Sequence, residues 1–192
     1  MTSTNTALVE IIHEFGRRYV AEYNNKLGHD PVVEKDEAWP SQCIIGEFNE
    51  ELNTWKPSAT EEMLTFENVE QALDIELHQD VKEYFGAMFS ESIQATCEEG
   101  HLSLLFAWSK YDFERLQQNL IGHVLMKRKL KQSLTVFFAV TDQDDMILSV
   151  KNDSGEVWVE KVGAEPHKKV ADSLINFMNM LAPHVETSAD EG

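Results

Sequence analysis

The chain has 192 residues, 42% of them hydrophobic, and a formal net charge of −18 at pH 7. This length and composition predict one globular domain that buries a core without help from disulfides or metals. The excess of acidic residues would repel nucleic acid, whereas a basic partner surface would be attracted and steered.

The cysteines and the apolar runs narrow the class of protein further. Cys43 and Cys97 are far apart and form no CxxC pattern, so we expect no zinc site, no disulfide and no cofactor. The longest apolar runs, 102–108 and 134–140, are far shorter than the ~20 residues that a membrane-spanning helix needs. The N-terminus lacks the basic start of a signal peptide. We therefore expect a cytosolic protein that meets a membrane only peripherally.

The first predicted element is an amphipathic helix. Ile12, Phe15 and Tyr19 recur at helical spacing, and Gly28 is suited to end the helix. The polar residues 29–42 include two prolines and predict a loop.

Two hairpins and a helical segment between them come next. Residues 43–48 and 53–57 predict two short strands around an acidic turn at Glu50 and Glu51. Helical spacing returns over residues 66–89, with a break expected near Leu77 and His78. After this segment, the apolar patterns on the two sides of Gly100 predict a second hairpin.

A long helix is predicted to begin at Ser109. Asp112, three residues later, gives the S-x-x-D pattern of a capping box. An apolar stripe then follows the helix, formed by Phe113, Leu116, Leu120, Ile121, Val124 and Leu125. His123 lies beside the stripe, and we expect a packed, hydrogen-bonded core histidine rather than a ligand or a base.

The last third of the chain predicts three strands and a helix. The continuously apolar residues 134–140 favour a central strand. Residues 146–151 and 156–162 predict two further strands, joined by the turn sequence NDSG at 152–155. An apolar stripe over 167–181 predicts the closing helix.

Short turns between successive strands favour an antiparallel or mixed sheet flanked by helices, which is an α+β fold. We expect a single domain over residues 1–185 and a disordered acidic tail over 186–192.

Two charged regions are candidates for function. The first is the basic cluster at the end of the long helix, formed by Lys127, Arg128, Lys129 and Lys131. Each cation there can stabilise the helix dipole by about 0.3–1 kcal/mol. Each can instead contact anionic lipid headgroups for about 1 kcal/mol. Both interpretations stay open, because cations at a helix end would still face solvent.

The second charged region is the acidic stretch 30–83, which holds 15 Asp and Glu residues against three Lys residues, a net charge of −12. Such a surface attracts a basic partner, although solubility is a sufficient alternative explanation.

Residues 108–131, WSKYDFERLQQNLIGHVLMKRKLK, resemble the Syd family of SecY-interacting bacterial proteins. The resemblance continues through PSQCII (40–45), WKP (55–57), EQALDI (70–75) and SVKNDSGEV (149–157), in the order of the family and at close to its spacing. It covers most of the chain, and the NLIGH stretch is its most specific part.

The resemblance implies an α+β fold similar to the SMI1/KNR4-like class and a non-enzymatic protein. We also expect a monomer. It implies location in the cytoplasm and, peripherally, on the cytoplasmic side of the inner membrane. The implied partner is SecY, the channel subunit of the translocase, held through its basic cytoplasmic loops by a concave electronegative face. The implied role is negative control or monitoring of translocases whose SecY is abnormal or uncomplexed.

Carboxylates of the acidic stretch are therefore the candidate SecY-binding residues. Glu70 and Asp74 fall within a matched motif and lie four apart on a predicted helix, so they should project from one face. The other acidic candidates are Glu47, Glu50, Glu51, Glu61, Glu62 and Glu67.

Trp158 is a further candidate, which the family pattern does not demand. It alternates with Glu156 and Glu160 and so shares one face of the predicted strand with them. If that face is open, an aromatic ring between two carboxylates suits a Lys or Arg side chain of a partner. If the strand is buried on both faces, Trp158 belongs to the core.

Other classes of function have less support in the sequence. A toxin-neutralising immunity protein of the SMI1/KNR4-like class is the main alternative. A DNA mimic needs carboxylates spaced like phosphates along a rod, whereas the acids here lie on mixed elements. The chain has no P-loop, GxGxxG or HExxH motif, so we expect no catalytic site.

Overall fold

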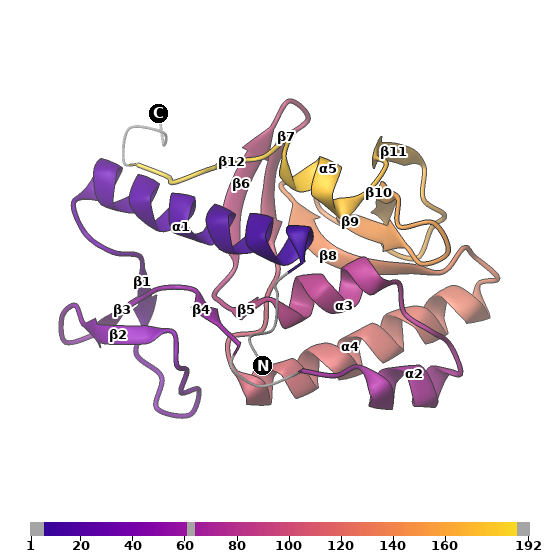
Figure 1. Ribbon diagram of the computed structural model, residues 1–192, viewed down its shortest axis with the longest axis horizontal. Helices are drawn as coiled ribbons and strands as arrows, with labels where there is room; N and C mark the ends of the chain where they lie inside the picture. Colours follow the sequence, from indigo (N-terminus) through magenta and orange to yellow (C-terminus); the bar gives the residue numbers. More distant parts are fainter. Residues whose placement is uncertain (1–5, 61–63, 188–192) are drawn as a thin grey trace.

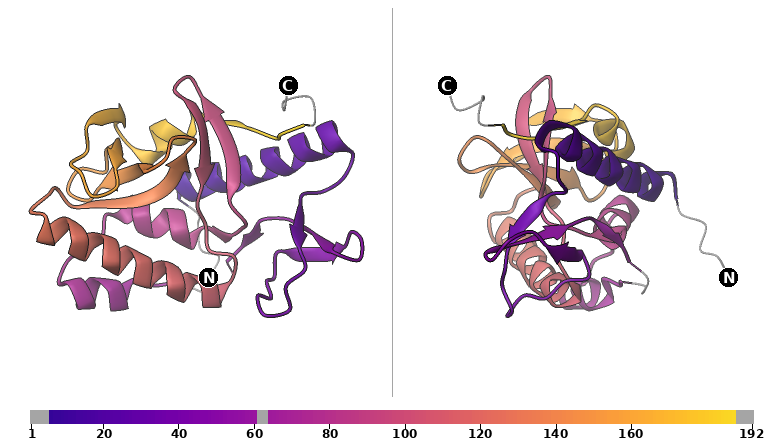
Figure 2. Two further views of the ribbon diagram at one scale, coloured as in Figure 1. Left: turned by 180° about the vertical axis from the view of Figure 1, so that it is seen from behind. Right: turned by 90° about the vertical axis from the view of Figure 1, so that its left-hand side faces the viewer.

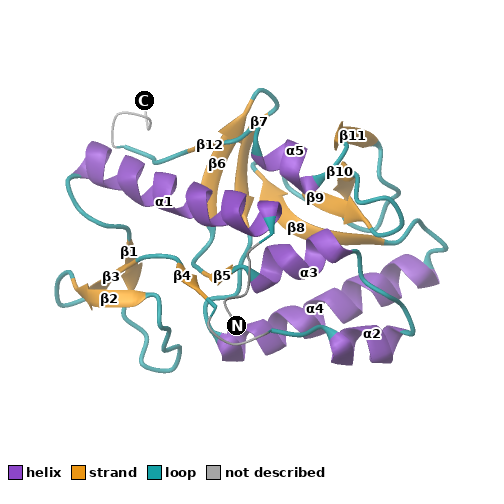
Figure 3. Ribbon diagram, viewed as in Figure 1, coloured by secondary structure: helices purple, strands orange, loops and turns teal. Residues whose placement is uncertain are grey.

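The computed structural model describes residues 6–60 and 64–187. The helices of this part of the chain are α1 (Ala7–Leu27), α2 (Glu67–Leu73), α3 (Gln79–Gly86), α4 (Lys110–Lys129) and α5 (Leu174–Met178) (Figures 1 and 3). Its strands are β1 (Val32–Glu34), β2 (Ile44–Glu47), β3 (Leu52–Trp55), β4 (Ser58–Ala59), β5 (Met88–Phe89), β6 (Ile93–Cys97), β7 (Gly100–Leu104), β8 (Thr135–Thr141), β9 (Met146–Lys151), β10 (Val157–Lys161), β11 (Lys168–Ala171) and β12 (Ala182–Pro183).

A curled, seven-stranded antiparallel sheet forms the centre of the fold, in the order β11-β10-β9-β8-β7-β6-β12. The apolar strand β8 is its middle strand, as predicted. A three-stranded sheet in the order β1-β3-β2 projects at one end of the molecule, and β4 pairs with β5 nearby (Figure 1). The combination of helices with a curled antiparallel sheet confirms the predicted α+β class.

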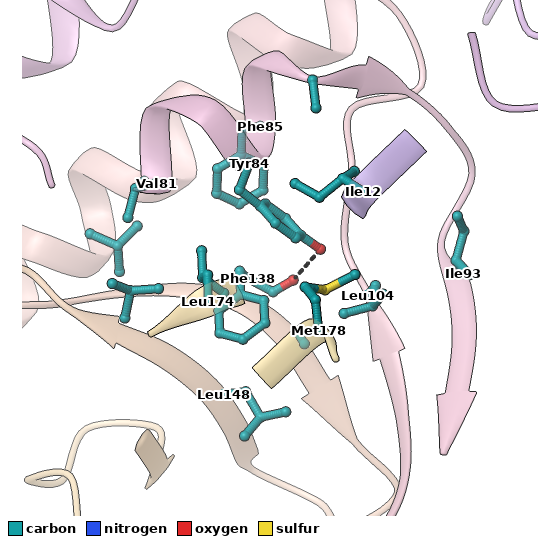
Figure 4. Packing of buried hydrophobic residues seen from close by; sticks show 14 of the residues in the cluster. Ile12, Val81, Tyr84, Phe85, Ile93, Leu104, Phe138, Leu148, Leu174 and Met178 are labelled. Atoms are coloured by element: carbon teal, nitrogen blue, oxygen red, sulfur yellow. Dashed lines mark hydrogen bonds between the residues drawn. The ribbon is translucent and has the colours of Figure 1, made fainter. Parts of the chain in front are cut away.

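Helices from distant parts of the chain meet at the central strand. Phe137 of β8 contacts His123 of α4, with ring centroids 5.3 Å apart. Its neighbour Phe138 contacts Tyr84 of α3 at 5.4 Å and Phe177 of α5 at 5.5 Å. The hydroxyl of Tyr84 donates a hydrogen bond to the carbonyl of Phe138 at 3.4 Å, so this polar atom is satisfied within the core (Figure 4).

The two long helices begin and end at residues suited to these positions. The N-cap Thr6 of α1 accepts a hydrogen bond from Val9, and Gly28 ends the helix with a left-handed φ of 78°, as predicted. Ser109 caps α4 and accepts a hydrogen bond from the backbone N–H of Asp112 at 3.2 Å. The Asp112 carboxylate accepts from the N–H of Trp108 at 2.8 Å, so this side of the capping box is displaced by one residue.

Three sequence predictions are wrong in detail. Residues 29–42 are not all loop, because they contain β1, which pairs with β3. The predicted helix 167–181 is instead the strand β11, which pairs with β10, followed by the short helix α5 capped by Ser173. The apolar stripe correctly predicted the buried residues of α5. In the residues that precede α5, pairing with β10 overrides the helical periodicity of the sequence. Leu125 of the α4 stripe is 50% exposed.

No helix in the two described ranges is long and apolar enough to cross a bilayer. The predicted tail lies, from residue 188 onward, outside the described residues.

Candidate functional site

The acidic candidates do not form one surface. Glu47, Glu50 and Glu51 lie on the small sheet around β2 and β3, at one end of the molecule. Those on helix α2 lie toward the other end (Figures 1 and 2). Two further candidates, Glu61 and Glu62, lie outside the described residues. The structure therefore offers two separate acidic regions for a basic partner.

The region on α2 is hollowed. It is a shallow, open depression of about 460 Å³, lined by Glu67, Glu70, Gln71, Asp74, Ile75 and Glu76; we call it the acidic hollow. The hollow exists because α2 stops sharply. Asp74 adopts a left-handed backbone conformation with φ of 50°, and the chain then turns back, with the N–H of Ile75 donating to the carbonyl of Glu70 at 3.1 Å.

The carboxylates of the acidic hollow differ in whether they have partners within the protein. Glu70 accepts hydrogen bonds from the backbone N–H of Leu77 at 2.9 Å and from Lys82 at 3.1 Å, so it holds the turn after α2 in place. Within the described residues, the carboxylates of Glu67, Asp74 and Glu76 are exposed and have no hydrogen-bond or salt-bridge partner.

This geometry changes the expectation for Glu70 and Asp74. They line the same hollow, but Asp74 has left the helix and Glu70 is already neutralised by Lys82. Glu76 was not among the sequence candidates. It follows the helix directly and shares the hollow with the predicted residues, and the density of acids around α2 was the only signal that could have indicated it.

The region on the small sheet is partly neutralised. Glu47 forms a salt bridge with Lys35 at 2.8 Å, while Glu50 and Glu51 are exposed in the turn between β2 and β3. Ile45 and Phe48 expose 51% and 44% of their surface beside these acids. This region can attract a cation, but with fewer unpaired carboxylates than the acidic hollow.

The basic cluster is not the exposed group that the sequence predicts. The side chain of Lys127 is completely buried, and its Nζ lies 3.3 Å from Glu160 Oε2 and 2.7 Å from the carbonyl oxygen of Ala164. Both the dipole and the lipid interpretations are therefore wrong for Lys127, because a buried ammonium that forms an ion pair cannot also face solvent or lipid.

The buried pair is part of a larger polar group. Thr135 donates a hydrogen bond to Glu160 Oε1 at 3.0 Å, and His123 Nε2 lies 3.3 Å from the Thr135 hydroxyl. Burial and the nearby Lys127 lower the pKa of His123 to about 4, so this ring is neutral at pH 7. Burial raises the pKa of Glu160, and Lys127 opposes that rise. His123 is thus a packed, hydrogen-bonded core residue, as predicted.

The other cations of the cluster differ from one another. Arg128 donates a hydrogen bond to the carbonyl of Leu73, at the end of α2, and so ties the two helix ends together. Lys129 and Lys131 are exposed.

Trp158 is half-buried and already has a cation beside it. The Nζ of Lys151 lies 5.5 Å from the centroid of its ring, and its Nε1 donates to Glu156 at 3.1 Å. A hydrogen bond from Lys169 is the main reason that the pKa of Glu156 is lowered. Glu160 is buried, so Trp158 does not lie between two exposed carboxylates. The chain itself supplies the cations that this face was expected to take from a partner.

Over residues 6–60 and 64–187, no group of three or more His, Cys, Asp or Glu side chains is arranged to hold a metal ion.

Comparison with known proteins gives a consistent result. A family model described as Syd protein (SUKH-2) matches residues 9–183. The chain is 54% identical over 190 residues to Protein Syd of Colwellia psychrerythraea, covering 94% of this chain and 95% of that protein. It is 39% identical over 187 residues to Protein Syd of Pseudoalteromonas atlantica, covering 95% and 98%. Identity to Protein Syd of Shewanella frigidimarina is 39% over 178 residues, covering 90% and 81%.

Proposed function

The chain belongs to the Syd family, and on this premise we propose that it is a non-enzymatic regulator that binds SecY. Binding takes place at the cytoplasmic face of the inner membrane, where the protein associates peripherally. It negatively controls or monitors the translocase and prefers SecY that is abnormal or uncomplexed.

The acidic hollow is the observation that carries this proposal. Glu67, Asp74 and Glu76 place three unpaired carboxylates around a hollow of about 460 Å³, which accommodates Lys or Arg side chains of a cytoplasmic loop. In the free protein these like charges repel one another, and a cationic loop relieves the repulsion. The Glu70–Lys82 salt bridge keeps the hollow in shape without adding to its charge.

A non-enzymatic role fits the placement of His123 and Glu160, two titratable groups with shifted pKa values. His123 and Glu160 are 9% and 0% exposed and interact with one another and with Lys127 and Thr135 rather than with a substrate. The unpaired carboxylates of the hollow lie at the surface, where they suit recognition of a basic segment.

Neutralising the acidic hollow is the test. The triple variant Glu67→Gln, Asp74→Asn and Glu76→Gln should bind SecY in nanodiscs about tenfold or more weakly than the unmodified chain, since charge pairs across an interface supply specificity and steering. Its remaining affinity should also depend less on salt, because fewer exposed charges are left for salt to screen. Such charges interact over only about 8 Å at physiological ionic strength. Affinity is measured by titration at low and high salt.

The matched control neutralises the other acidic region. Glu47→Gln, Glu50→Gln and Glu51→Gln together remove the same formal charge from the small sheet, and this variant should bind SecY nearly as well as the unmodified chain. If only the control loses affinity, the partner surface is the small sheet and not the hollow. If the unmodified chain binds no SecY at all, the proposed function is wrong, and the immunity-protein alternative, tested by neutralisation of a toxin, takes its place.

A further inference from the structure

Three lysines stand apart from all other cations of the chain. Every Lys and Arg residue lies within the described ranges, and nearly all are engaged by a carboxylate, an aromatic ring or a backbone carbonyl. The exceptions are Lys129, Lys131 and Lys161, whose ammonium groups are exposed and have no hydrogen-bond, salt-bridge or cation–π partner among the described residues. In a chain with 34 acidic and 16 basic residues, unpaired lysines are unexpected.

The three lysines lie in one region. Gln132, next to Lys131, donates a hydrogen bond from Nε2 to the carbonyl of Gly163 at 2.8 Å. Gly163 lies two residues after Lys161, at the turn that leaves β10. The end of α4 therefore packs beside this turn, and Figures 1 and 2 show the two segments side by side at the same end of the molecule.

The backbone conformation at position 131 does not favour a lysine. This residue ends α4 in a left-handed conformation with φ of 56°, and the N–H of Gln132 donates to the carbonyl of Lys127 at 3.0 Å, as in a Schellman motif. Glycine is the favoured residue there, because a side chain is strained in this conformation. A lysine at such a position is a departure from the local rule, of the kind expected at functional sites.

Exposed apolar residues adjoin these lysines in the sequence. Leu130, between Lys129 and Lys131, is 47% exposed, and Val162, next to Lys161, is 48% exposed. We call these five residues, Lys129, Leu130, Lys131, Lys161 and Val162, the basic–apolar patch. A surface that combines unpaired cations with exposed aliphatic side chains suits the boundary between lipid headgroups and acyl chains.

We propose that the basic–apolar patch docks the protein directly on an anionic phospholipid surface, independently of SecY. The lysines contact lipid phosphates, and Leu130 and Val162 enter the layer beneath them. Nucleic acid offers the same phosphates but has no place for the two aliphatic side chains, so the apolar part of the patch favours lipid. At physiological ionic strength, the membrane's repulsion of those acidic residues that lie more than about 8 Å from it is largely screened.

The docked orientation also brings the acidic hollow to the membrane. Arg128, in the last turn of α4 and next to the patch, donates a hydrogen bond to the carbonyl of Leu73, and the following residue, Asp74, lines the hollow. A molecule held by the patch thus keeps the hollow on the same end of the protein as the membrane contact, where loops that emerge from a membrane protein can reach its carboxylates.

Sedimentation with lipid vesicles tests the docking without SecY, so its failure is separate from failure of the proposed function. The unmodified chain should sediment with vesicles of phosphatidylglycerol and phosphatidylcholine at physiological ionic strength, and much less with phosphatidylcholine alone. The variant Lys129→Gln, Lys131→Gln and Lys161→Gln should lower the partition coefficient by about 100-fold, since each cation near an anionic surface contributes about fivefold. A second variant, Leu130→Ser with Val162→Ser, should also weaken binding.

The control variant replaces three lysines that already have carboxylate partners. Lys26→Gln, Lys35→Gln and Lys56→Gln change the formal charge equally and should leave sedimentation nearly unchanged. The proposal is overturned if the unmodified chain does not bind the anionic vesicles, or if the control lowers binding as much as the patch variant. Loss of binding to duplex DNA in the lysine variant, with vesicle binding intact, would identify nucleic acid as the partner instead.

Discussion

Replacing Lys127 by methionine is expected to lower the free energy of unfolding by about 3–5 kcal/mol. The substitution keeps most of the apolar stem but removes the ammonium that lies 3.3 Å from Glu160 Oε2. Glu160 is then left as a buried carboxylate without a cation, and leaving one buried charge unpaired costs far more than the pair contributes. Chemical denaturation at pH 7 measures the loss.

The loss should depend on pH in a defined direction. Burial raises the pKa of Glu160 in the folded protein, and removing Lys127 removes the charge that opposes this rise. A folded-state pKa above the unfolded value means that the folded protein binds the proton more tightly. The deficit of Lys127→Met is therefore present when pH lies above the folded pKa of Glu160. It should shrink as pH falls towards that pKa, because protonation neutralises the buried carboxylate.

A second substitution separates charge from packing. Lys127→Met combined with Glu160→Gln removes the unpaired charge and keeps an oxygen that can accept from the Thr135 hydroxyl, so the double variant should recover at least half of the loss. Lys129→Met, on the exposed side of the same helix turn, should change stability by no more than about 0.5 kcal/mol. Equal losses for the single and double variants would show that Lys127 stabilises the fold through packing alone.

The burial of Lys127 could not be predicted from local sequence patterns. Helical periodicity identified α4, its N-cap Ser109 and most of its buried stripe, because these depend on residues close in sequence. The sequence position of Lys127 at a helix end suggested a solvated cation. Its burial depends on Glu160, which lies 33 residues away on a strand of the central sheet. No local pattern reports that pairing.

The same limit explains the outcome for the acidic candidates. The sequence predicted the density of acids and the helix that carries Glu67 and Glu70, both of which are local properties. It could not indicate that Glu70 would form a salt bridge with Lys82, because this contact follows from tertiary packing. For the same reason it could not indicate that the small sheet would lie away from α2. Charge density alone does not separate a structural carboxylate from one free to bind a partner.

The NDSG turn at 152–155 was predicted, but its contact with His78 was not. The turn lies between β9 and β10 as expected, and Gly155 adopts a φ of 76°. A Cβ atom at this glycine would lie 2.6 Å from both Cε1 and Nε2 of His78. Asn152 of the same turn accepts from the N–H of His78 at 2.9 Å and donates to the carbonyl of Glu76 at 2.8 Å. The turn is therefore fastened to the linker between α2 and α3.

Gly155→Ala is accordingly expected to destabilise the protein by about 2–3 kcal/mol. The left-handed conformation costs an alanine roughly 1–2 kcal/mol. The new methyl group must also displace the ring of His78, whose Nδ1 accepts from the N–H of Asp80 at 3.1 Å as the N-cap of α3, and losing a cap costs about 1 kcal/mol. Thermal and chemical unfolding measure the sum of the two effects.

Gly163→Ala provides the matched control for this prediction. Gly163 has a similar φ of 82°, but a Cβ atom there would meet no atom within 4 Å, so the control carries only the backbone cost of roughly 1–2 kcal/mol. The excess loss in Gly155→Ala over Gly163→Ala isolates the contact with His78. Placing Gly155→Ala in a His78→Ala background should remove that excess, because the ring is no longer there to be displaced. An unchanged cost in that background would mean that the turn does not press on His78, and the loss would then belong to the backbone of the turn alone.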